Sequence, residues 1–173
     1  MTPSTARGQR RGTPARRRLL LVATALVLGL LGWAAKVAVE NTLAAGGSVD
    51  LGLLELRLTY NSGVAFSLGA GLPTAVVVAG TGLIAAVIAG YAWFTAPEIG
   101  LWGLFGLAAI VAGATTNLLD RAADGAVTDY LHTGWFATFN VPDALISVGA
   151  VVVAASMLFA PEQRSTERRA DPR

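Results

Sequence analysis

Apolar residues gather into four long runs along the chain, separated by more polar segments. The runs cover residues 19–39, 72–94, 100–119 and 144–160. A helix needs about 20 consecutive apolar residues to cross the hydrocarbon core of a bilayer, and each run has about that length. The pattern predicts four membrane-spanning helices, and the fourth, which is the shortest, is expected to begin slightly before its apolar run.

Between the first two runs, residues 54–61 alternate strictly between apolar and polar side chains. This alternation places Leu54, Leu56, Leu58 and Tyr60 on one face, which is typical of a half-buried strand and not of a further helix. The strand leads to Gly63, where the backbone is free to turn. We therefore expect a strand and a turn at the membrane surface, just before the second span.

The composition agrees with a membrane protein, because 54% of the residues are hydrophobic, 14% are charged and the mean hydropathy is +0.58. Soluble domains contain about 25% charged residues. The chain has no cysteine and one histidine, His132, which excludes disulfides, thiol nucleophiles and zinc sites built on several histidines. The side chains that remain for chemistry are mainly carboxylates, hydroxyls and one lysine, Lys36.

Basic residues flank the outer ends of the four runs. Of the 13 lysines and arginines, six lie in the first 18 positions and four in the last ten. By the positive-inside rule both termini are expected to be cytoplasmic, with membrane lipids and not nucleic acid as the partner of the basic residues. Segments 40–71 and 120–143 would then face outward, and 95–99 would form a cytoplasmic turn. This divides the chain into a basic tail (1–18), a membrane domain (19–160) and a second basic tail (161–173).

The arginine-rich start has a second interpretation, since a cleavable secretory signal also begins with basic residues and an apolar run. Cleavage near Ala44 and Ala45 would leave three spans. It would also place the basic C-terminal tail outside.

Candidate chemistry lies in the second outward segment, which holds four of the 11 acidic residues: Asp120, Asp124, Asp129 and Asp143. Asp120 next to Arg121 predicts an ion pair that fixes the loop to the bundle, and Asp124 before Gly125 predicts a turn. Asp129 lies among apolar residues without an adjacent base, an unfavourable place for an idle carboxylate.

Asp143 follows Pro142 at the start of the fourth span, where an acid interacts favourably with the free amides of a helix. Asn140 is an equally good cap, which would leave Asp143 free for another role. Two close carboxylates can share a proton and act as general base and general acid on a peptide bond. Of six pairs among the four aspartates, Asp129 with Asp143 ranks first, but the residues do not decide the choice.

Four motifs in the same order resemble the bacterial lipoprotein signal peptidases, or signal peptidase II family. Residues 61–67 resemble its Asn-x-Gly-x-Ala-Phe-Ser block, and residues 117–121 its Asn-x-x-Asp-Arg block. Residues 127–130 and 139–143 resemble its Val-x-Asp-aromatic and Phe-Asn-x-Ala-Asp blocks. The resemblance extends over residues from about 30 to 160.

The resemblance implies a membrane aspartic endopeptidase that cuts prolipoproteins before a lipid-modified cysteine, with Asp129 and Asp143 as the catalytic pair. It implies a bacterial cytoplasmic membrane enzyme without a cofactor or a metal-ligand cluster, whose active site lies near the outer face. We expect the protein to be a monomer. The fold would be an all-α bundle of four transmembrane helices with a small external β-cradle, and a helix around Trp135 would cover the substrate. Supporting or substrate-contacting positions would be Lys36, Asn61, Gly63, Phe66, Asn117, Asp120, Arg121 and Asn140.

The chain differs from the family pattern at some positions. Gly32 stands where an acid usually precedes Lys36, Thr116 replaces a glycine, and Pro142 replaces an alanine. A silent homologue that binds lipidated precursors is therefore one alternative. Another pairs Lys36 with Ser67 as a serine-lysine peptidase. A small four-span transporter is a third, although no span interior carries an acid.

Overall fold

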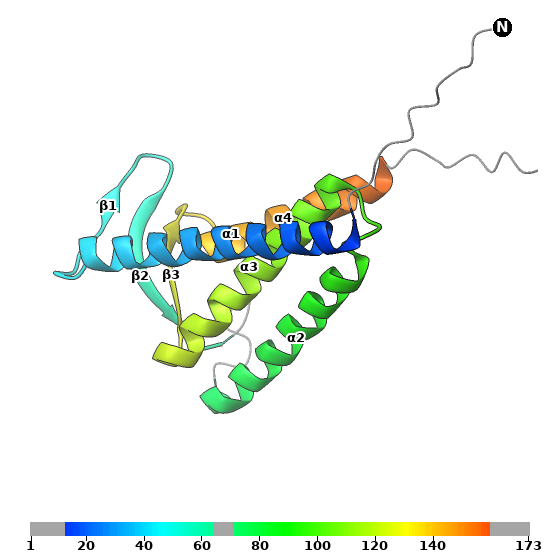
Figure 1. Ribbon diagram of the computed structural model, residues 1–173. Coiled ribbons are helices and arrows are strands. Elements are labelled where there is room, and N and C mark those ends of the chain that lie inside the picture. Colours follow the sequence, from blue (N-terminus) through cyan, green and yellow to red (C-terminus); the bar gives the residue numbers. More distant parts are fainter. Residues whose placement is uncertain (1–12, 64–70, 160–173) are drawn as a thin grey trace, which may run out of the picture.

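The computed structural model describes residues 13–63 and 71–159 of the 173-residue chain (Figure 1). Its helices are α1 (Pro14–Thr42), α2 (Thr74–Thr95), α3 (Leu101–Asp124) and α4 (Val141–Leu158). All four are long and apolar enough to cross a membrane, which confirms the four predicted spans. As expected, α4 begins before its apolar run. Most of both predicted tails, together with Phe66 and Ser67, lies outside the described residues.

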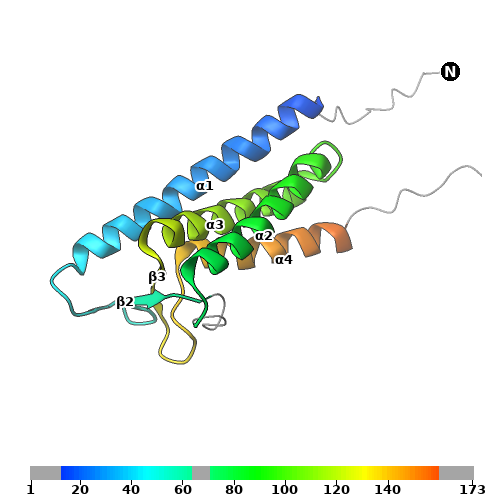
Figure 2. The same cartoon turned by 90° about the horizontal axis from the view of Figure 1, so that it is seen from below.

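Helix α3 is the centre of the bundle and contacts each of the other three helices (Figure 2). Half of its most apolar stretch is buried, against at most 17% in the other helices. Because only a minor part of α1, α2 and α4 is covered by protein, their remaining apolar surface is available to lipid. The described ends of α1 and α4, where the tails attach, lie at the same end of the bundle (Figure 2).

Glycines allow α3 and α4 to approach each other closely. A Cβ atom on Gly106 would lie 2.8 Å from the carbonyl oxygen of Gly149, and a Cβ on Gly149 would lie 2.6 Å from that of Gly106. A Cβ on Gly113 would overlap the carbonyl oxygen of Pro142. Larger residues would separate the helices at these points. The contact at Gly113 holds the start of α4, and with it Asp143, against α3.

Arg17 belongs to the bundle, although residues 1–18 were expected to form a basic tail. Helix α1 begins at Pro14, and Arg17 is buried. Its side chain donates hydrogen bonds to the carbonyls of Ala96, at 2.8 Å, and Ile99. These carbonyls lie in the turn between α2 and α3, so Arg17 provides donors for acceptors that a helix end leaves free.

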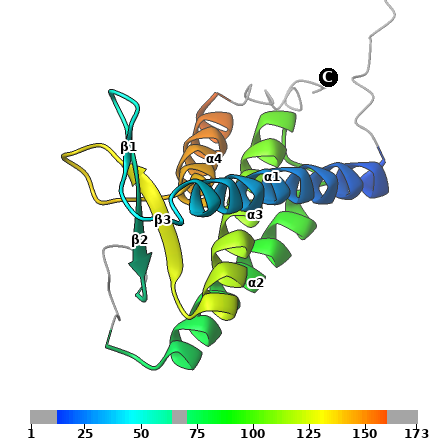
Figure 3. The same ribbon diagram turned by 90° about the vertical axis from the view of Figure 1, so that its left-hand side faces the viewer.

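A three-stranded antiparallel sheet covers the end of the bundle where α1 ends and α4 begins (Figure 3). Its strands are β1 (Val49–Asp50), β2 (Glu55–Asn61) and β3 (Val127–His132), in the order β1-β2-β3. The strand predicted from the alternating pattern is confirmed as β2. The sheet joins both segments that were expected to face outward, since β2 precedes α2 and β3 follows α3.

The predicted face of β2 is wrong in its second half. Tyr60, expected on the buried face with the leucines, is 66% exposed. The pairing with β3 is irregular between Leu56 and Thr59, which marks a β-bulge. An inserted residue reverses the direction of every later side chain in the strand. Thr59 therefore pairs with Asp129, and Asn61 shares the face of Asp129 while Tyr60 points away.

The helix implied around Trp135 is not present. Residues 133–138 form an irregular loop between β3 and a backbone bridge that pairs Leu131 with Phe139. Gly134 has a φ of 83°, a conformation that allows the sharp reversal and that interrupts a helix. The loop leaves the side chain of Trp135 84% exposed.

Candidate active site

Helix α3 carries three of the predicted site residues near its end. Asn117, Asp120 and Arg121 have the spacing i, i+3 and i+4, so they lie on one face of the helix. Asp120 and Arg121 are buried, with 3% and 4% of their surface exposed. Gly125 ends the helix in the left-handed conformation and directs the chain into β3. The helix thus presents its polar face directly to the strand that follows it.

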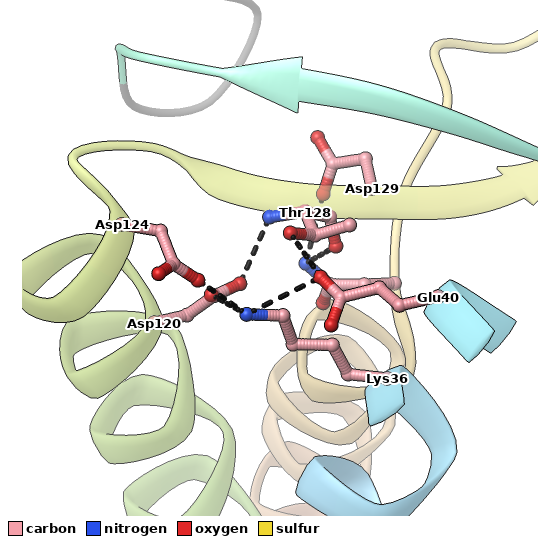
Figure 4. A network of polar contacts seen from close by, with 7 residues as sticks. Lys36, Glu40, Asp120, Asp124, Thr128 and Asp129 are labelled. Atoms are coloured by element: carbon pink, nitrogen blue, oxygen red, sulfur yellow. Dashed lines mark hydrogen bonds and ion pairs between the residues drawn. The ribbon is translucent and has the colours of Figure 1, made fainter. Parts of the chain in front are cut away.

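The expected ion pair between Asp120 and Arg121 is not formed, because adjacent residues of a helix point in directions about 100° apart. Asp120 pairs instead with Lys36, and its second oxygen accepts a hydrogen bond from the amide of Thr128 at 2.8 Å (Figure 4). Asp124 was expected to be a turn residue. It is the last residue of α3, and its carboxylate lies 2.8 Å from Nζ of Lys36.

Asp129 lies in the middle of β3 with 4% of its surface exposed. Its Oδ1 accepts a hydrogen bond from the side-chain amide of Asn140 at 2.8 Å, and its Oδ2 accepts one from Asn61 at 3.4 Å. Burial, and after it the carboxylate of Asp143, raises the pKa of Asp129 to about 7, although both amides and Arg121 favour the ionised form. Asp129 is therefore partly protonated at neutral pH.

Asp143 is in the first turn of α4 and forms a capping box with Asn140. The side chain of Asn140 accepts from the amide of Asp143 at 2.8 Å, and Oδ2 of Asp143 accepts from the amide of Asn140 at 3.3 Å. Its Oδ1 accepts from the side-chain amide of Asn117 at 2.7 Å. From the sequence, Asn140 and Asp143 were alternative candidates for the cap of this helix. In the structure both residues take part in the cap.

Asn140 links the two aspartates. It is 1% exposed, its side-chain amide binds Asp129 and its backbone amide binds Asp143. Two of the six pairs that the sequence left open share a binding residue in the structure. Asp129 and Asp143 share Asn140, whereas Asp120 and Asp124 share the cation Lys36.

Arg121 connects the site to the end of β2. It donates a hydrogen bond to the carbonyl of Gly63, and the amide of Gly63 in turn donates to Oδ1 of Asn61 at 3.0 Å. This bond holds the Asn61 amide with its nitrogen toward Asp129. Phe66 follows in the sequence but lies outside the described residues.

Lys36 is the cation at the centre of a cluster of carboxylates. Its Nζ lies within 4.0 Å of three carboxylates, those of Glu40, Asp120 and Asp124. An amine serves as a general base only when it is neutral, and three anions oppose the loss of its proton. These contacts argue against Lys36 as the base of a serine-lysine pair. Ser67, the proposed nucleophile of that pair, lies outside the described ranges. Within those ranges, no three His, Cys, Asp or Glu side chains are grouped to hold a metal ion.

Sequence reasoning missed three residues beside the aspartates: Glu40, Thr128 and Tyr130. The hydroxyl of Thr128 donates to Glu40 at 3.0 Å, and that of Tyr130 accepts from the amide of Val141 at 3.3 Å. Burial raises the pKa of Tyr130. The i, i+4 spacing of Lys36 and Glu40 was visible in the sequence. The contacts of Thr128 and Tyr130 depend on the arrangement of β3 against the helices.

Four apolar helices, with two aspartates linked through Asn140 at one end of the bundle, are the arrangement expected of a membrane enzyme of the aspartic peptidase class. The chain belongs to the signal peptidase II family, whose sequence profile, described as Signal peptidase (SPase) II, matches residues 19–159.

Curated relatives agree with this membership. The chain is 33% identical over 177 residues to the lipoprotein signal peptidase of Mycobacterium leprae (strain Br4923), a match that covers 98% of this chain and 86% of the relative. It is 37% identical over 123 residues to that of Brucella ovis (strain ATCC 25840 / 63/290 / NCTC 10512), covering 68% and 76%.

Solved structures share the fold. Two bacterial membrane enzyme structures, determined by the in meso method at 2.3 and 1.9 Å resolution, superpose with TM-scores of 0.69 and 0.67. The matches cover 89% and 82% of this chain, and 94% of the other chain in each case. Sequence identity is 19% and 20%, so these matches concern the fold.

Proposed function

We propose that this chain removes signal peptides from prolipoproteins, with Asp129 and Asp143 as its catalytic carboxylates. The observation that carries the proposal is the link through Asn140, which binds one aspartate with its side chain and the other with its backbone. Relatives named lipoprotein signal peptidase, at 33–37% identity, support the substrate class. The buried position of Asp129 supports a shared proton.

The two aspartates have different surroundings, which suits two different roles. Each aspartate accepts two hydrogen bonds, but Asp143 also lies at a helix N-terminus, whose dipole favours a carboxylate. Asp129, with its raised pKa, holds the shared proton. In this scheme Asp143 takes a proton from the attacking water while Asp129 donates its own to the scissile carbonyl oxygen.

Collapse of the resulting tetrahedral intermediate completes the reaction. Asp143 gives the proton from water to the leaving amine, and the intermediate returns one hydroxyl proton to Asp129 as its carbonyl re-forms. The peptide C–N bond breaks, and the products are a new carboxyl terminus and a free amine. Both aspartates then have the protonation states with which they began.

The substrate of this proposal is a prolipoprotein cut immediately before a lipid-modified cysteine. The acyl chains would remain among membrane lipids along the apolar helix surfaces, and the peptide bond would reach the aspartates at the end of the bundle. Supporting roles fall to Asn61, Asn117 and Arg121, and to Lys36 with Asp120, through the hydrogen bonds described above. Gly63 and Phe66 remain proposed contacts on the basis of their motif.

We propose further that both termini are cytoplasmic in a bacterial plasma membrane and that the aspartates lie near the outer face, in a monomer. The basic residues near both termini support this orientation. So does the position of the sheet, which lies at the opposite end of the bundle from the start of α1.

The proposal is tested by incubating purified protein with a diacylglyceryl-modified precursor and with the same precursor lacking the lipid. We expect cleavage of the lipidated precursor alone, with a product that begins at the modified cysteine by mass spectrometry. Binding without cleavage, in a detergent that supports a control enzyme, would identify a silent homologue. Equal cleavage of both precursors would contradict the proposed substrate.

A further inference from the structure

Thr128, the residue before Asp129, has each of its polar groups bound to a different part of the molecule. Its amide donates to Asp120 of α3 at 2.8 Å, and its hydroxyl donates to Glu40 of α1 at 3.0 Å. Its carbonyl accepts from the Asn140 side chain at 3.5 Å. Thr128 is 2% exposed. Contacts to three separate elements fix both the position and the rotation of the backbone that carries Asp129.

The hydrogen bond to Glu40 is distinct because its acceptor lies outside the motif residues. Glu40 lies in the last turn of α1, and its side chain is 33% exposed. Its carboxylate is 3.4 Å from Nζ of Lys36, which also binds Asp120 (Figure 4). Lys36 thus holds the two carboxylates that bind the hydroxyl and the amide of Thr128.

The ion pair between Lys36 and Glu40 does not by itself explain why position 40 carries an acid. A lysine that precedes a glutamate by four residues is the less favourable order on a helix, and Lys36 already has Asp120 and Asp124 as partners. The Thr128 hydroxyl, by contrast, is buried and would lose its acceptor in Glu40 if the acid were removed.

We propose that Glu40 and Thr128 are positioning residues for the peptidase reaction, acting on Asp129 through a hydrogen bond from the Thr128 hydroxyl to the Glu40 carboxylate. The inference rests on the proposed role of Asp129. The bond ties α1 to β3 beside the catalytic carboxylate and limits its displacement relative to Asp143. A displacement of about 1 Å in an active site can lower the rate about a hundredfold.

The test measures kcat and KM of the full-length protein on a lipidated precursor, together with thermal unfolding. Glu40→Ala and Thr128→Val remove the two partners of the bond, and Thr128→Ser keeps the hydroxyl. Glu98→Gln, in the exposed turn at the other end of the bundle, and Thr81→Val, whose hydroxyl binds its own helix at 2.8 Å, are the matched controls.

We expect kcat to fall about 10- to 100-fold in Glu40→Ala and in Thr128→Val, with KM changed less than about twofold. Thr128→Ser should restore most of kcat. The double variant should lose little more than either single variant, because both changes break one bond.

The inference is overturned if kcat per folded molecule stays at the wild-type value in both variants, even if their unfolding temperature falls. It is also overturned if kcat of the double variant falls by the product of the two factors measured for the single variants. The proposed function is tested separately with Asp129→Asn. If that variant cleaves normally, the catalytic role of Asp129 fails, whatever the variants at positions 40 and 128 show.

Discussion

Replacing Asp129 by asparagine should abolish activity and also make the stability of the protein less sensitive to alkaline pH. The folded protein holds the pKa of this carboxyl at about 7, against 3.8 for an unperturbed aspartate, because the group is 4% exposed and close to Asp143. The folded state therefore binds a proton that the unfolded state has released. In wild type, stability is lost as pH rises from about 4 through 7, and asparagine cannot ionise.

The size of this effect follows from the two pKa values. One pH unit corresponds to about 1.36 kcal/mol, so the carboxyl destabilises the folded state by about 1–2 kcal/mol at pH 5 and by about 4 kcal/mol at pH 8. Asparagine also brings a second amide toward Asn61, but this disturbance does not depend on pH. The free energy of unfolding of the variant should therefore gain about 2–3 kcal/mol relative to wild type between pH 5 and pH 8.

Thermal unfolding in detergent, followed by tryptophan emission, measures the difference. For a chain of this size, this gain corresponds to a rise of about 5–10 °C in unfolding temperature. Glu98→Gln removes an exposed carboxyl from the far end of the bundle and is the control. The reasoning would be refuted if the unfolding temperature of Asp129→Asn minus that of wild type did not rise from pH 5 to pH 8.

Three further outcomes are expected. The value of kcat/KM should fall above about pH 7 as Asp129 loses its proton, and a rate that keeps rising to pH 9 would contradict this. Gly113→Ala should lower stability by about 1–3 kcal/mol or more and reduce kcat, because the added methyl group overlaps the Pro142 carbonyl. Lys36→Met should destabilise the folded protein by about 3–5 kcal/mol, because it leaves Asp120 buried without its cation. Adding Asp120→Asn to this variant should recover part of the lost stability.

The four helices could be predicted from the sequence because the bilayer requires long apolar runs. The strand β2 could be predicted from its period of two. The direction of its second half could not, because the bulge between Leu56 and Thr59 leaves no mark in the alternation. That bulge decides that Asn61, and not Tyr60, faces Asp129.

The site was predicted in part. Local context identified Asp129 as an unusual carboxylate, and the motif resemblance selected Asp143 as its partner. The partners of Asp120 could not be predicted from its neighbour Arg121, because they come from α1 and β3. Such pairings depend on how distant segments pack, whereas sequence patterns report mainly on local structure.

The central claim is that Asp129 and Asp143 together carry out the cleavage. The most direct test is the single-turnover rate on a lipidated precursor for wild type, Asp129→Asn and Asp143→Asn, each shown to be folded by its thermal transition. We predict that each variant loses at least about a thousandfold in rate, and that the double variant is no slower than the singles. A folded variant of either residue that cleaves within tenfold of wild type would contradict the account.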